Sequence, residues 1–352
     1  MAFILSLLNR FTIMFRVIAL IILLLLSSLS NANNLGFKTS TLSDIDKRRE
    51  ISIFVIYPTN SDSKPILFAD SSVFSGFYAI ENAKPINNSY PLLVISHGYG
   101  GNWRNLSWIA SNLAKLGYIV ALIDHPDISK YSKTPKQAAQ LWQRPIDLQR
   151  TITFLQENPD FAGKVDNNNI SLLGHSLGGW TVMVAGGANF SVAQFLEDCR
   201  ITKAQHECEL SEALGIRSNK QSAFNHLYDP RVKKIIALDT GFARGLTKSS
   251  LKKLTIPTLI ISAEINIGDL PVEMESGYLA ENLPVTKYIL LKDAMHFSFI
   301  QECKKDAFSI LPEKDKIICK DEYGVSRKNI HTIILKYIKE FLDVNKKKFF
   351  IK

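Results

Sequence analysis

The sequence predicts an α/β fold, a doubly wound and mostly parallel sheet with a cap-like insertion after the helix that begins near residue 177. Short, wholly apolar runs such as Leu92–Ser96 alternate with segments of helical spacing, as in buried parallel sheets. The apolar run Ile170–Leu173 leads into a glycine-rich turn and then into a small, helix-forming segment. The 352 residues are 46% hydrophobic, which suffices for a large core.

The first elements are predicted from residue types that favour strands or helices and from the prolines and glycines that end them. Glu50–Tyr57 is rich in β-branched and aromatic residues and reads as a strand that Pro58 ends. Residues 60–90 are rich in Ser, Asn and Pro and are expected to run over the surface. Trp103–Leu116 has helical spacing, and Gly117 ends it.

The later elements follow the same alternation of strand and helix. They are the strands Tyr118–Ile123, Ile170–Leu173, Val232–Leu238, Pro257–Ser262 and Thr286–Leu291 and the helices Pro145–Leu155 and Ile330–Leu342. Two segments interrupt this rhythm, at 188–230 and 302–323. Long structureless loops are uncommon, so the first is expected to form a small helical cap over the site. The whole of 33–352 is then one domain.

The N-terminal 32 residues resemble a signal peptide rather than part of the fold. Arg10 and Arg16 precede the unbroken apolar run Val17–Leu26, and Ser30 and Ala32 give the small-x-small pattern of a cleavage site. Cleavage is expected near Ala32, which would make the protein periplasmic or secreted. The alternative is an uncleaved anchor helix, although spanning needs about 20 apolar residues.

The cysteine count agrees with export. Cys199, Cys208, Cys303 and Cys319 all follow the apolar run, and an even number suggests two disulfides. Three pairings are possible; Cys199–Cys208 and Cys303–Cys319 are favoured because each closes a short polar loop. Four unpaired thiols are the alternative. No Cys-x-x-Cys or His-x-x-x-His spacing exists, so no metal site and no cofactor are expected.

The chain is basic, with a formal net charge of +9. Such a charge permits peripheral contact with an anionic membrane surface. Nothing resembles a nucleic-acid-binding module, so no nucleic-acid partner is expected.

The motif Gly174-His175-Ser176-Leu177-Gly178 carries the chemistry. A serine in this setting sits on a sharp strand-to-helix turn with its hydroxyl clear of the sheet. It needs a base and an acid, which in this architecture follow it along the chain in the order acid, histidine. Of seven histidines, His296 lies just past the last strand, where the base is required.

Two carboxylates compete for the role of acid. Asp239 follows the strand Val232–Leu238, and Glu264 follows the next one. Both lie at carboxyl ends of strands, where sites in open α/β sheets form. Asp239 is favoured, because the turn Thr240-Gly241 can aim its side chain, and Glu264 is kept as the alternative.

The oxyanion hole needs two backbone N–H donors. Leu177, directly after the nucleophile, is expected to supply one. The loop His97-Gly98-Tyr99-Gly100-Gly101 is expected to supply the other from Tyr99, since glycines let the backbone approach the substrate.

These motifs resemble the α/β-hydrolase superfamily, in particular the branch of platelet-activating-factor acetylhydrolases and dienelactone-hydrolase-like esterases. The resemblance spans roughly Arg48 to His296 and includes the loop at His97, Asp124-His125, and the helix with Arg144 and Asp147. That branch takes its acid one strand before the usual one, which matches Asp239. In cutinase-like polyester hydrolases the acid stands near the position of Asn266, which cannot serve.

The resemblance implies an α/β-hydrolase fold and a serine carboxylic-ester hydrolase that acts through an acyl-enzyme. Short-acyl esters, platelet-activating-factor-like or oxidised phospholipids, and lactones are the expected substrate classes. An exported lipase or cutinase-like polyester hydrolase is the first alternative. A non-catalytic binding module on a hydrolase scaffold is the second.

Overall fold

Ten strands of the described chain form one sheet in the order β10-β9-β8-β7-β5-β6-β2-β1-β4-β3. The computed structural model describes residues 34–44, 49–126, 135–202, 205–218, 220–266, 268, 270–322 and 324–343. The strands are β1 (Asn34–Ser43), β2 (Glu50–Thr59), β3 (Ile66–Phe68), β4 (Phe77–Glu81), β5 (Ser89–Ser96), β6 (Ile119–Asp124), β7 (Lys164–His175), β8 (Lys234–Leu238), β9 (Thr258–Ile265) and β10 (Thr286–Met295). From β6 to β10 neighbouring strands are parallel, whereas β2 is antiparallel to β1 and β6.

The helices alternate with these strands, as the sequence predicted. The α-helices are α2 (Ser107–Ala114), α3 (Pro135–Ala138), α4 (Gln143–Glu157), α5 (Pro159–Ala162), α6 (Leu177–Ala185), α7 (Val192–Thr202), α8 (Gln205–Ala213), α9 (Lys248–Leu251), α10 (Ser276–Asn282), α11 (Ala307–Ile310) and α12 (Arg327–Phe341). Short 3-10 helices are η1 (Trp103–Leu106), η2 (Gln221–Phe224), η3 (Ala243–Gly245), η4 (Val272–Met274), η5 (His296–Phe299) and η6 (Glu313–Cys319).

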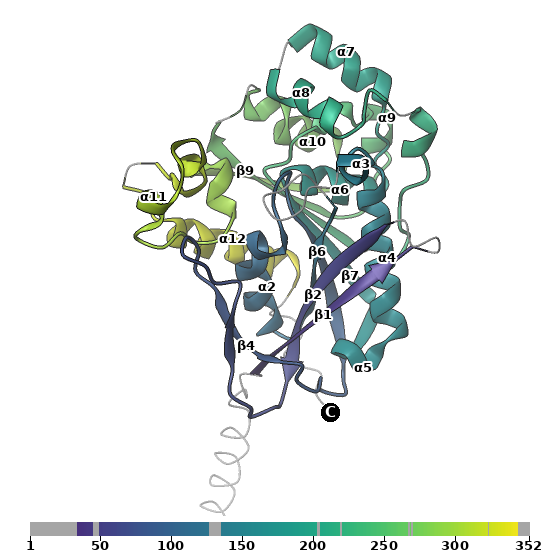
Figure 1. Ribbon diagram of the computed structural model, residues 1–352. Coiled ribbons are helices and arrows are strands. Elements are labelled where there is room, and N and C mark those ends of the chain that lie inside the picture. Colours follow the sequence, from purple (N-terminus) through teal and green to yellow (C-terminus); the bar gives the residue numbers. More distant parts are fainter. Residues whose placement is uncertain are drawn as a thin grey trace, which may run out of the picture. The chain divides into compact units, whose positions relative to one another are not determined.

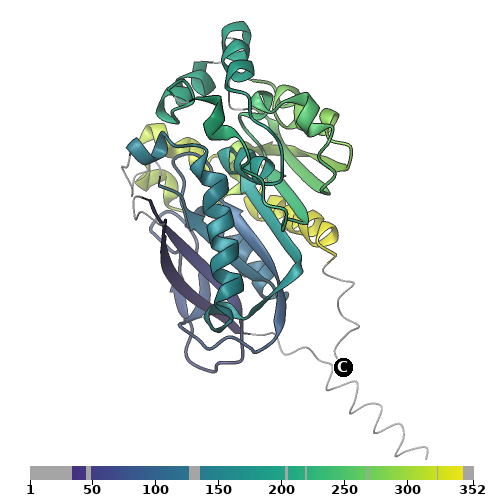
Figure 2. The ribbon, with the colours of Figure 1, turned by 90° about the vertical axis from the view of Figure 1, so that its right-hand side faces the viewer.

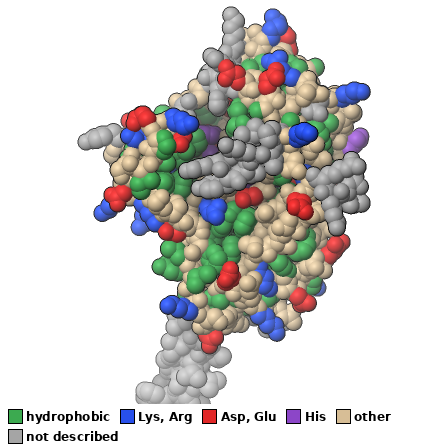
Figure 3. Space-filling view, viewed as in Figure 1, with side chains coloured by type: hydrophobic (Ala, Val, Ile, Leu, Met, Phe, Trp, Pro, Cys, Tyr) green, Lys and Arg blue, Asp and Glu red, His purple; other side chains and the backbone are tan. Residues whose placement is uncertain are grey.

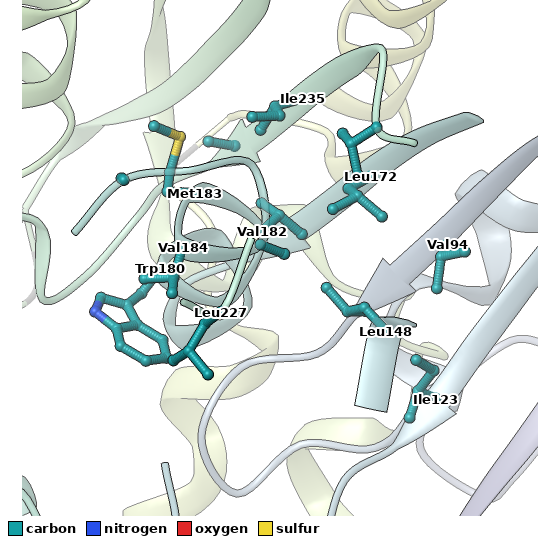
Figure 4. Packing of buried hydrophobic residues seen from close by; sticks show 14 of the residues in the cluster. Val94, Ile123, Leu148, Leu172, Trp180, Val182, Met183, Val184, Leu227 and Ile235 are labelled. Carbon is teal, nitrogen blue, oxygen red and sulfur yellow. The ribbon is translucent and has the colours of Figure 1, made fainter. Parts of the chain in front are cut away.

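The sheet separates two hydrophobic clusters, which makes the fold doubly wound. Alternate residues of one strand enter different clusters: Val94 of β5 packs on the side of α4 and α6, and Ile95 on the side of α2 and α12. Figure 4 shows Leu148 of α4 close to Val94 and Ile123 of the sheet. Figures 1 and 2 show α4 covering one face of the sheet, with α2 and α12 on the other.

Two strand predictions were wrong in detail. Residues 60–90 hold β3, β4 and the start of β5 rather than only a surface loop, and β4 joins the sheet beside β1. Residues 60–90 contain no apolar run long enough to predict a strand. Pro58 lies inside β2, beyond the stretch Ser52–Ile56 that pairs with β6, so its missing N–H leaves no gap in that ladder.

The insertion at 188–230 is mostly helical in the described residues. It holds α7, α8 and η2, and Figure 1 shows α7 and α8 beside α9 and α10. Disulfides join Cys199 to Cys208 and Cys303 to Cys319, the pairing that the sequence favoured.

The predicted signal segment 1–32 and its cleavage site lie outside the described residues. Across the ranges that the structure describes, no helix has the length and apolar character needed to cross a membrane.

Acid is expected to destabilise the fold through a buried histidine. His331 on α12 stacks on Trp108 at 3.6 Å between ring centroids, and its Nε2–H faces the carbonyl oxygens of Ser298 and Ile300. Burial lowers its pKa from 6.5 to about 4, so between these values the unfolded chain binds a proton that the folded chain does not. The free energy of unfolding therefore falls as pH drops through this window, by about 1.4 kcal/mol per pH unit for each such group.

Urea unfolding at several pH values checks this expectation. His331→Gln should reduce the slope of unfolding free energy against pH by about one proton between roughly pH 6 and 4.5. The exposed His226→Gln serves as the control and should leave the slope unchanged. Equal slopes in the wild type and His331→Gln would contradict the assignment.

Candidate active site

Ser176 occupies a strained turn between β7 and α6. Its φ of 56° and ψ of −122° lie in a region that L-residues rarely adopt. A Cβ on Gly174 would stand 1.9 Å from the carbonyl oxygen of Gly178, and one on Gly178 would stand 2.1 Å from that of Ser96. Only glycine fits at either position, because the helix starts in contact with the strands.

His296 and Asp239 are hydrogen-bonded to each other, 57 residues apart in sequence. The Nδ1 of His296, the first residue of η5 after β10, lies 2.6 Å from Oδ2 of Asp239. Asp239 follows β8 with a φ of 42°, and its Oδ1 accepts the Ala263 N–H at 2.9 Å. Burial alone would raise the pKa of Asp239, but the hydrogen bonds from His296 and Ala263 outweigh it and lower the pKa. An ionised Asp239 holds the Nδ1–H, which leaves Nε2 of the neutral imidazole as a proton acceptor.

His175 contacts His296 through a hydrogen bond and through its ring. Its Nε2–H donates to the carbonyl oxygen of His296 at 3.0 Å, and the two rings lie 4.6 Å apart between centroids. Burial and then the neighbouring His296 lower the pKa of His175 to about 3, so its ring stays neutral. The sequence reasoning took His175 only as part of the motif and missed this contact.

Ser176, Asp239 and His296 line one cavity of about 540 Å³. Tyr99 and Leu177 line it as well. Figure 3 shows a histidine side chain in a recess of the molecular surface. The structure thus brings together five of the predicted site residues, three from connecting segments and two from the first positions of α6 and η5.

Glu264 is not among the described residues that line this cavity. It is exposed, and its Oε2 accepts the backbone N–H of Asp293 at 3.0 Å. Asp293 has a φ of 60° at the irregularity of β10 between Leu291 and Met295, so Glu264 accepts the N–H of a residue in a strained backbone conformation. Asn266 lines the cavity, but its amide serves its own loop through Gly268 and Leu270.

Two backbone segments lie beside Ser176. Leu177 is the first residue of α6, where a helix leaves its N–H groups without partners inside the helix. A Cβ on Gly98 would lie 3.1 Å from the Cβ of Ser176, so the loop at 97–101 runs directly beside the serine. These are the two places where an oxyanion hole requires its donors.

A buried polar network holds that loop. His125 is neutral, since burial and the Arg144 guanidinium lower its pKa to about 3. Its Nδ1–H donates to Oδ2 of Asp147 at 2.8 Å, and its Nε2 accepts the hydroxyl proton of Ser96 at 2.9 Å. Arg144 donates to Ser96 Oγ at 3.3 Å and to the carbonyl oxygen of His97.

Asp147 is the buried anchor of this network. Arg49 donates to both of its carboxylate oxygens, at 2.9 and 2.6 Å. Burial would raise the pKa of Asp147, but the Arg49 and His125 hydrogen bonds keep it below its usual value. The residues lie in β5 and α4, directly before β2 and directly after β6, and no local sequence signal links them. Only the sheet topology makes them neighbours.

Part of the chain matches the family model of platelet-activating factor acetylhydrolase, isoform II. The match covers residues 72–153 and so includes the loop at 97–101 and most of α4, but not Ser176. It spans the polar network described above, apart from Arg49.

The chain is also similar to curated cutinases and to a solved esterase structure. The chain is 23% identical over 215 residues to Cutinase est1 and 24% identical over 216 residues to Cutinase est2, both from Thermobifida alba. These matches cover 60% of this chain and 55% and 54% of the cutinases, so the chain spans about half the length of these relatives. A ferulic acid esterase from Streptomyces cinnamoneus superposes with a TM-score of 0.60 at 19% identity over 90% of both chains. This likeness shows the α/β-hydrolase fold that the sequence predicted.

Proposed function

We propose that this chain of α/β-hydrolase fold is a serine carboxylic-ester hydrolase. The observation that carries the proposal is the hydrogen bond between His296 and Asp239 at the cavity that Ser176 lines from its strained turn. The matched family and relatives are ester hydrolases by name, which supports the same reaction class.

In the proposed mechanism, the Ser176 hydroxyl attacks the ester carbonyl while Nε2 of His296 takes its proton. The N–H groups of Leu177 and Tyr99 donate to the developing oxyanion. The tetrahedral intermediate collapses, the leaving alcohol takes the proton from His296, and an acyl-enzyme remains. Water, deprotonated by His296, then releases the acid and restores Ser176. Asp239 holds the imidazole in the required tautomer throughout.

Short-acyl esters, including platelet-activating-factor-like and oxidised phospholipids and lactones, are the proposed substrates. The family match at residues 72–153 supports this class. A cutinase-like polyester hydrolase is the second candidate, which the Thermobifida cutinases favour. The residue at 266 argues against a polyester hydrolase, because Asn266 places an amide near the position where cutinase-like enzymes have the catalytic acid.

A chain-length series tests the choice of substrate. p-Nitrophenyl esters from acetate to palmitate, together with a polyester film, should give the highest kcat/KM at two to four carbons and little release from the film. A maximum at long chains with activation at an interface would favour a lipase or polyester hydrolase. Failure of a fluorophosphonate probe to label the folded protein would favour a binding module.

Export remains a prediction from the N-terminal segment, and the two disulfides support it. Peripheral contact with an anionic membrane surface likewise stays a prediction from the net charge of +9.

The polar network predicts that Arg144 positions the oxyanion loop. Arg144→Lys removes the planar fork that reaches both Ser96 and His97, so the loop should shift. We expect kcat on p-nitrophenyl butyrate to fall by about 10- to 100-fold, below the cost of losing an oxyanion donor outright. KM should change little, because Arg144 is buried and is not among the described residues that line the cavity.

Arg150→Lys is the matched control, since Arg150 lies on the same helix and contacts the same network at Asp147, 3.3 Å away, from a partly exposed position. It should keep kcat within about twofold. Equal losses in the two variants, or a loss that follows melting temperature alone, would reject the positioning role.

A further inference from the structure

Two carboxyl groups converge on the wall of the cavity, beside the turn that follows Asp239. Glu207 belongs to α8 in the helical insertion, and Glu275 precedes α10. A Cβ on Gly241 would lie 3.6 Å from Glu207 Oε1 and 3.6 Å from Glu275 Oε2. Both glutamates line the same cavity as Ser176. The mechanism above uses neither of them.

The two glutamates differ in how they are satisfied. Glu207 Oε1 accepts the backbone N–H of Phe242 at 2.9 Å. Both carboxyl oxygens of Glu275 are buried, and neither meets hydrogen-bond geometry with a donor in the described part of the chain. The Ala243 backbone amide and the Glu207 carboxyl group are its polar neighbours, but neither is placed well enough to meet that geometry. A buried carboxyl group with poorly placed donors is costly, so Glu275 is an acceptor that a bound ligand would satisfy better.

The electrostatic surroundings of Glu275 favour a cation. Burial raises the pKa of Glu275 well above its usual value, and the charge of Glu207, a hydrogen bond with Glu207 and the charge of Asp239 add to the rise, which the Ala243 backbone amide opposes. A cation placed here would interact with up to three carboxyl groups, and its charge would stabilise their ionised forms. It would also offset their effect on the oxyanion that forms beside them.

The rest of the wall is compatible with an ammonium group. The aromatic residues Tyr99, Phe242 and Phe297 are among those that line the cavity, and aromatic rings attract cations through their faces. Within the described ranges, no lysine or arginine lines the cavity, although the chain as a whole carries a net charge of +9.

The carboxyl pair is adjacent to the nucleophile. The backbone N–H of Gly241 donates to the carbonyl oxygen of Ser176 at 3.4 Å, so the turn that both glutamates reach touches the serine itself. A group bound at the glutamates would therefore be separated from the reacting carbonyl by only a short linker.

We propose that Glu207 and Glu275 form a subsite for a cationic group, an alkylammonium, carried by the ester substrate. The ammonium donates to, or lies against, the Glu275 and Glu207 carboxylates while Ser176 attacks the carbonyl. This inference rests on the proposed hydrolase function and deepens it, because it assigns the enzyme to positively charged small esters.

Pairs of esters that differ only in charge test the subsite. Choline butyrate and 3,3-dimethylbutyl butyrate place the charge on the alcohol; p-nitrophenyl 6-aminohexanoate and p-nitrophenyl heptanoate place it on the acyl chain. In the wild type we expect the charged member of at least one pair to have a kcat/KM about tenfold or more above its neutral partner. The pair that shows the preference identifies the side of the ester that binds at the glutamates.

Glu207→Gln, Glu275→Gln and the double variant should lower this ratio toward one. A glutamine at 207 keeps an oxygen for the Phe242 N–H, and the ratio within one variant cancels any loss of folded protein. Glu281→Gln is the matched control, because it removes an exposed carboxylate from α10 outside the cavity. A ratio near one for both pairs in the wild type, or a ratio that the 207 and 275 variants leave unchanged, overturns the proposal without touching the hydrolase function.

Binding to Ser176→Ala separates the subsite from the chemistry. Calorimetry with butyltrimethylammonium chloride should detect binding to this variant and lose it in Ser176→Ala/Glu207→Gln/Glu275→Gln. If the wild-type protein hydrolysed no ester of either pair while Ser176→Ala still bound butyltrimethylammonium, the subsite would be supported and the proposed function rejected. Absence of binding to Ser176→Ala, or binding that both glutamate changes leave intact, would overturn the subsite.

Discussion

Replacing Ser176 by alanine is expected to abolish turnover, with a fall in kcat of at least about 10⁴-fold. The hydroxyl is the only atom that the variant lacks, and in the proposed mechanism it forms the acyl bond. The remaining rate would come from binding and the oxyanion donors alone. Initial rates with p-nitrophenyl butyrate, together with fluorophosphonate labelling of the intact protein, measure the loss.

The melting temperature separates chemistry from folding in this experiment. Alanine keeps the Cβ, and the backbone strain at φ 56° is unchanged, so Ser176→Ala should melt near the wild type or slightly above it. Ser309→Ala, at an exposed serine of α11, is the matched control and should retain full activity. A rate above about a tenth of the wild type in Ser176→Ala would exclude the mechanism.

Asp239→Asn should give the second large effect, a drop in kcat of about 10⁴-fold. Asparagine can present an N–H to Nδ1 of His296, which would stabilise the tautomer with its proton on Nε2 and remove the acceptor for the Ser176 proton. The anionic charge that stabilises the imidazolium is lost as well. Rates on p-nitrophenyl butyrate between about pH 6 and 9 measure both consequences.

Glu264→Gln provides the comparison, because Glu264 is the other carboxylate that the sequence offered. A glutamine oxygen can still accept the Asp293 N–H, so this variant should keep kcat within about twofold. A normal rate in Asp239→Asn together with a collapsed rate in Glu264→Gln would reverse the assignment of the acid.

The sequence predicted the fold most reliably where a strand is buried on both faces. Leu92–Ser96 and Ile170–Leu173 are continuous apolar runs, and both lie in the parallel centre of the sheet. β1 was not predicted, because more than half of its sequence NLGFKTSTLS is polar and only residues 35–37 are buried. β4 pairs with β1 over only two residue pairs, too little to mark the local sequence.

The candidate site was predictable as far as chain order and local turn chemistry allowed. Ser176 and His296 follow from a glycine-flanked turn and from a histidine after the last strand. The choice between Asp239 and Glu264 depended on which strand end faces the histidine, which is a property of the assembled sheet. The hydrogen bond to His296 is made by Asp239, whereas Glu264 points to the Asp293 turn.

Contacts between distant elements could not be read from the sequence at all. Glu207 and Glu275 are separated by the whole of β8 and β9, and they meet because the helical insertion packs against α10 and η3. Arg49 and Asp147 meet across β2 and α4. Buried pairs of this kind have no periodicity or spacing of their own.

The placement of the disulfides has a consequence for how the cavity is assembled. Cys199–Cys208 ties α7 to α8, the helix that carries Glu207 and Leu210, and Cys303–Cys319 closes the segment that carries Ile317. The strands β7 and β8, which Ser176 and Asp239 follow, contain no cysteine. Thiol reduction should therefore leave the reactive groups in place and loosen the surfaces that choose among substrates. We therefore expect chain folding alone to establish the chemical competence of the molecule, and oxidation to establish its selectivity.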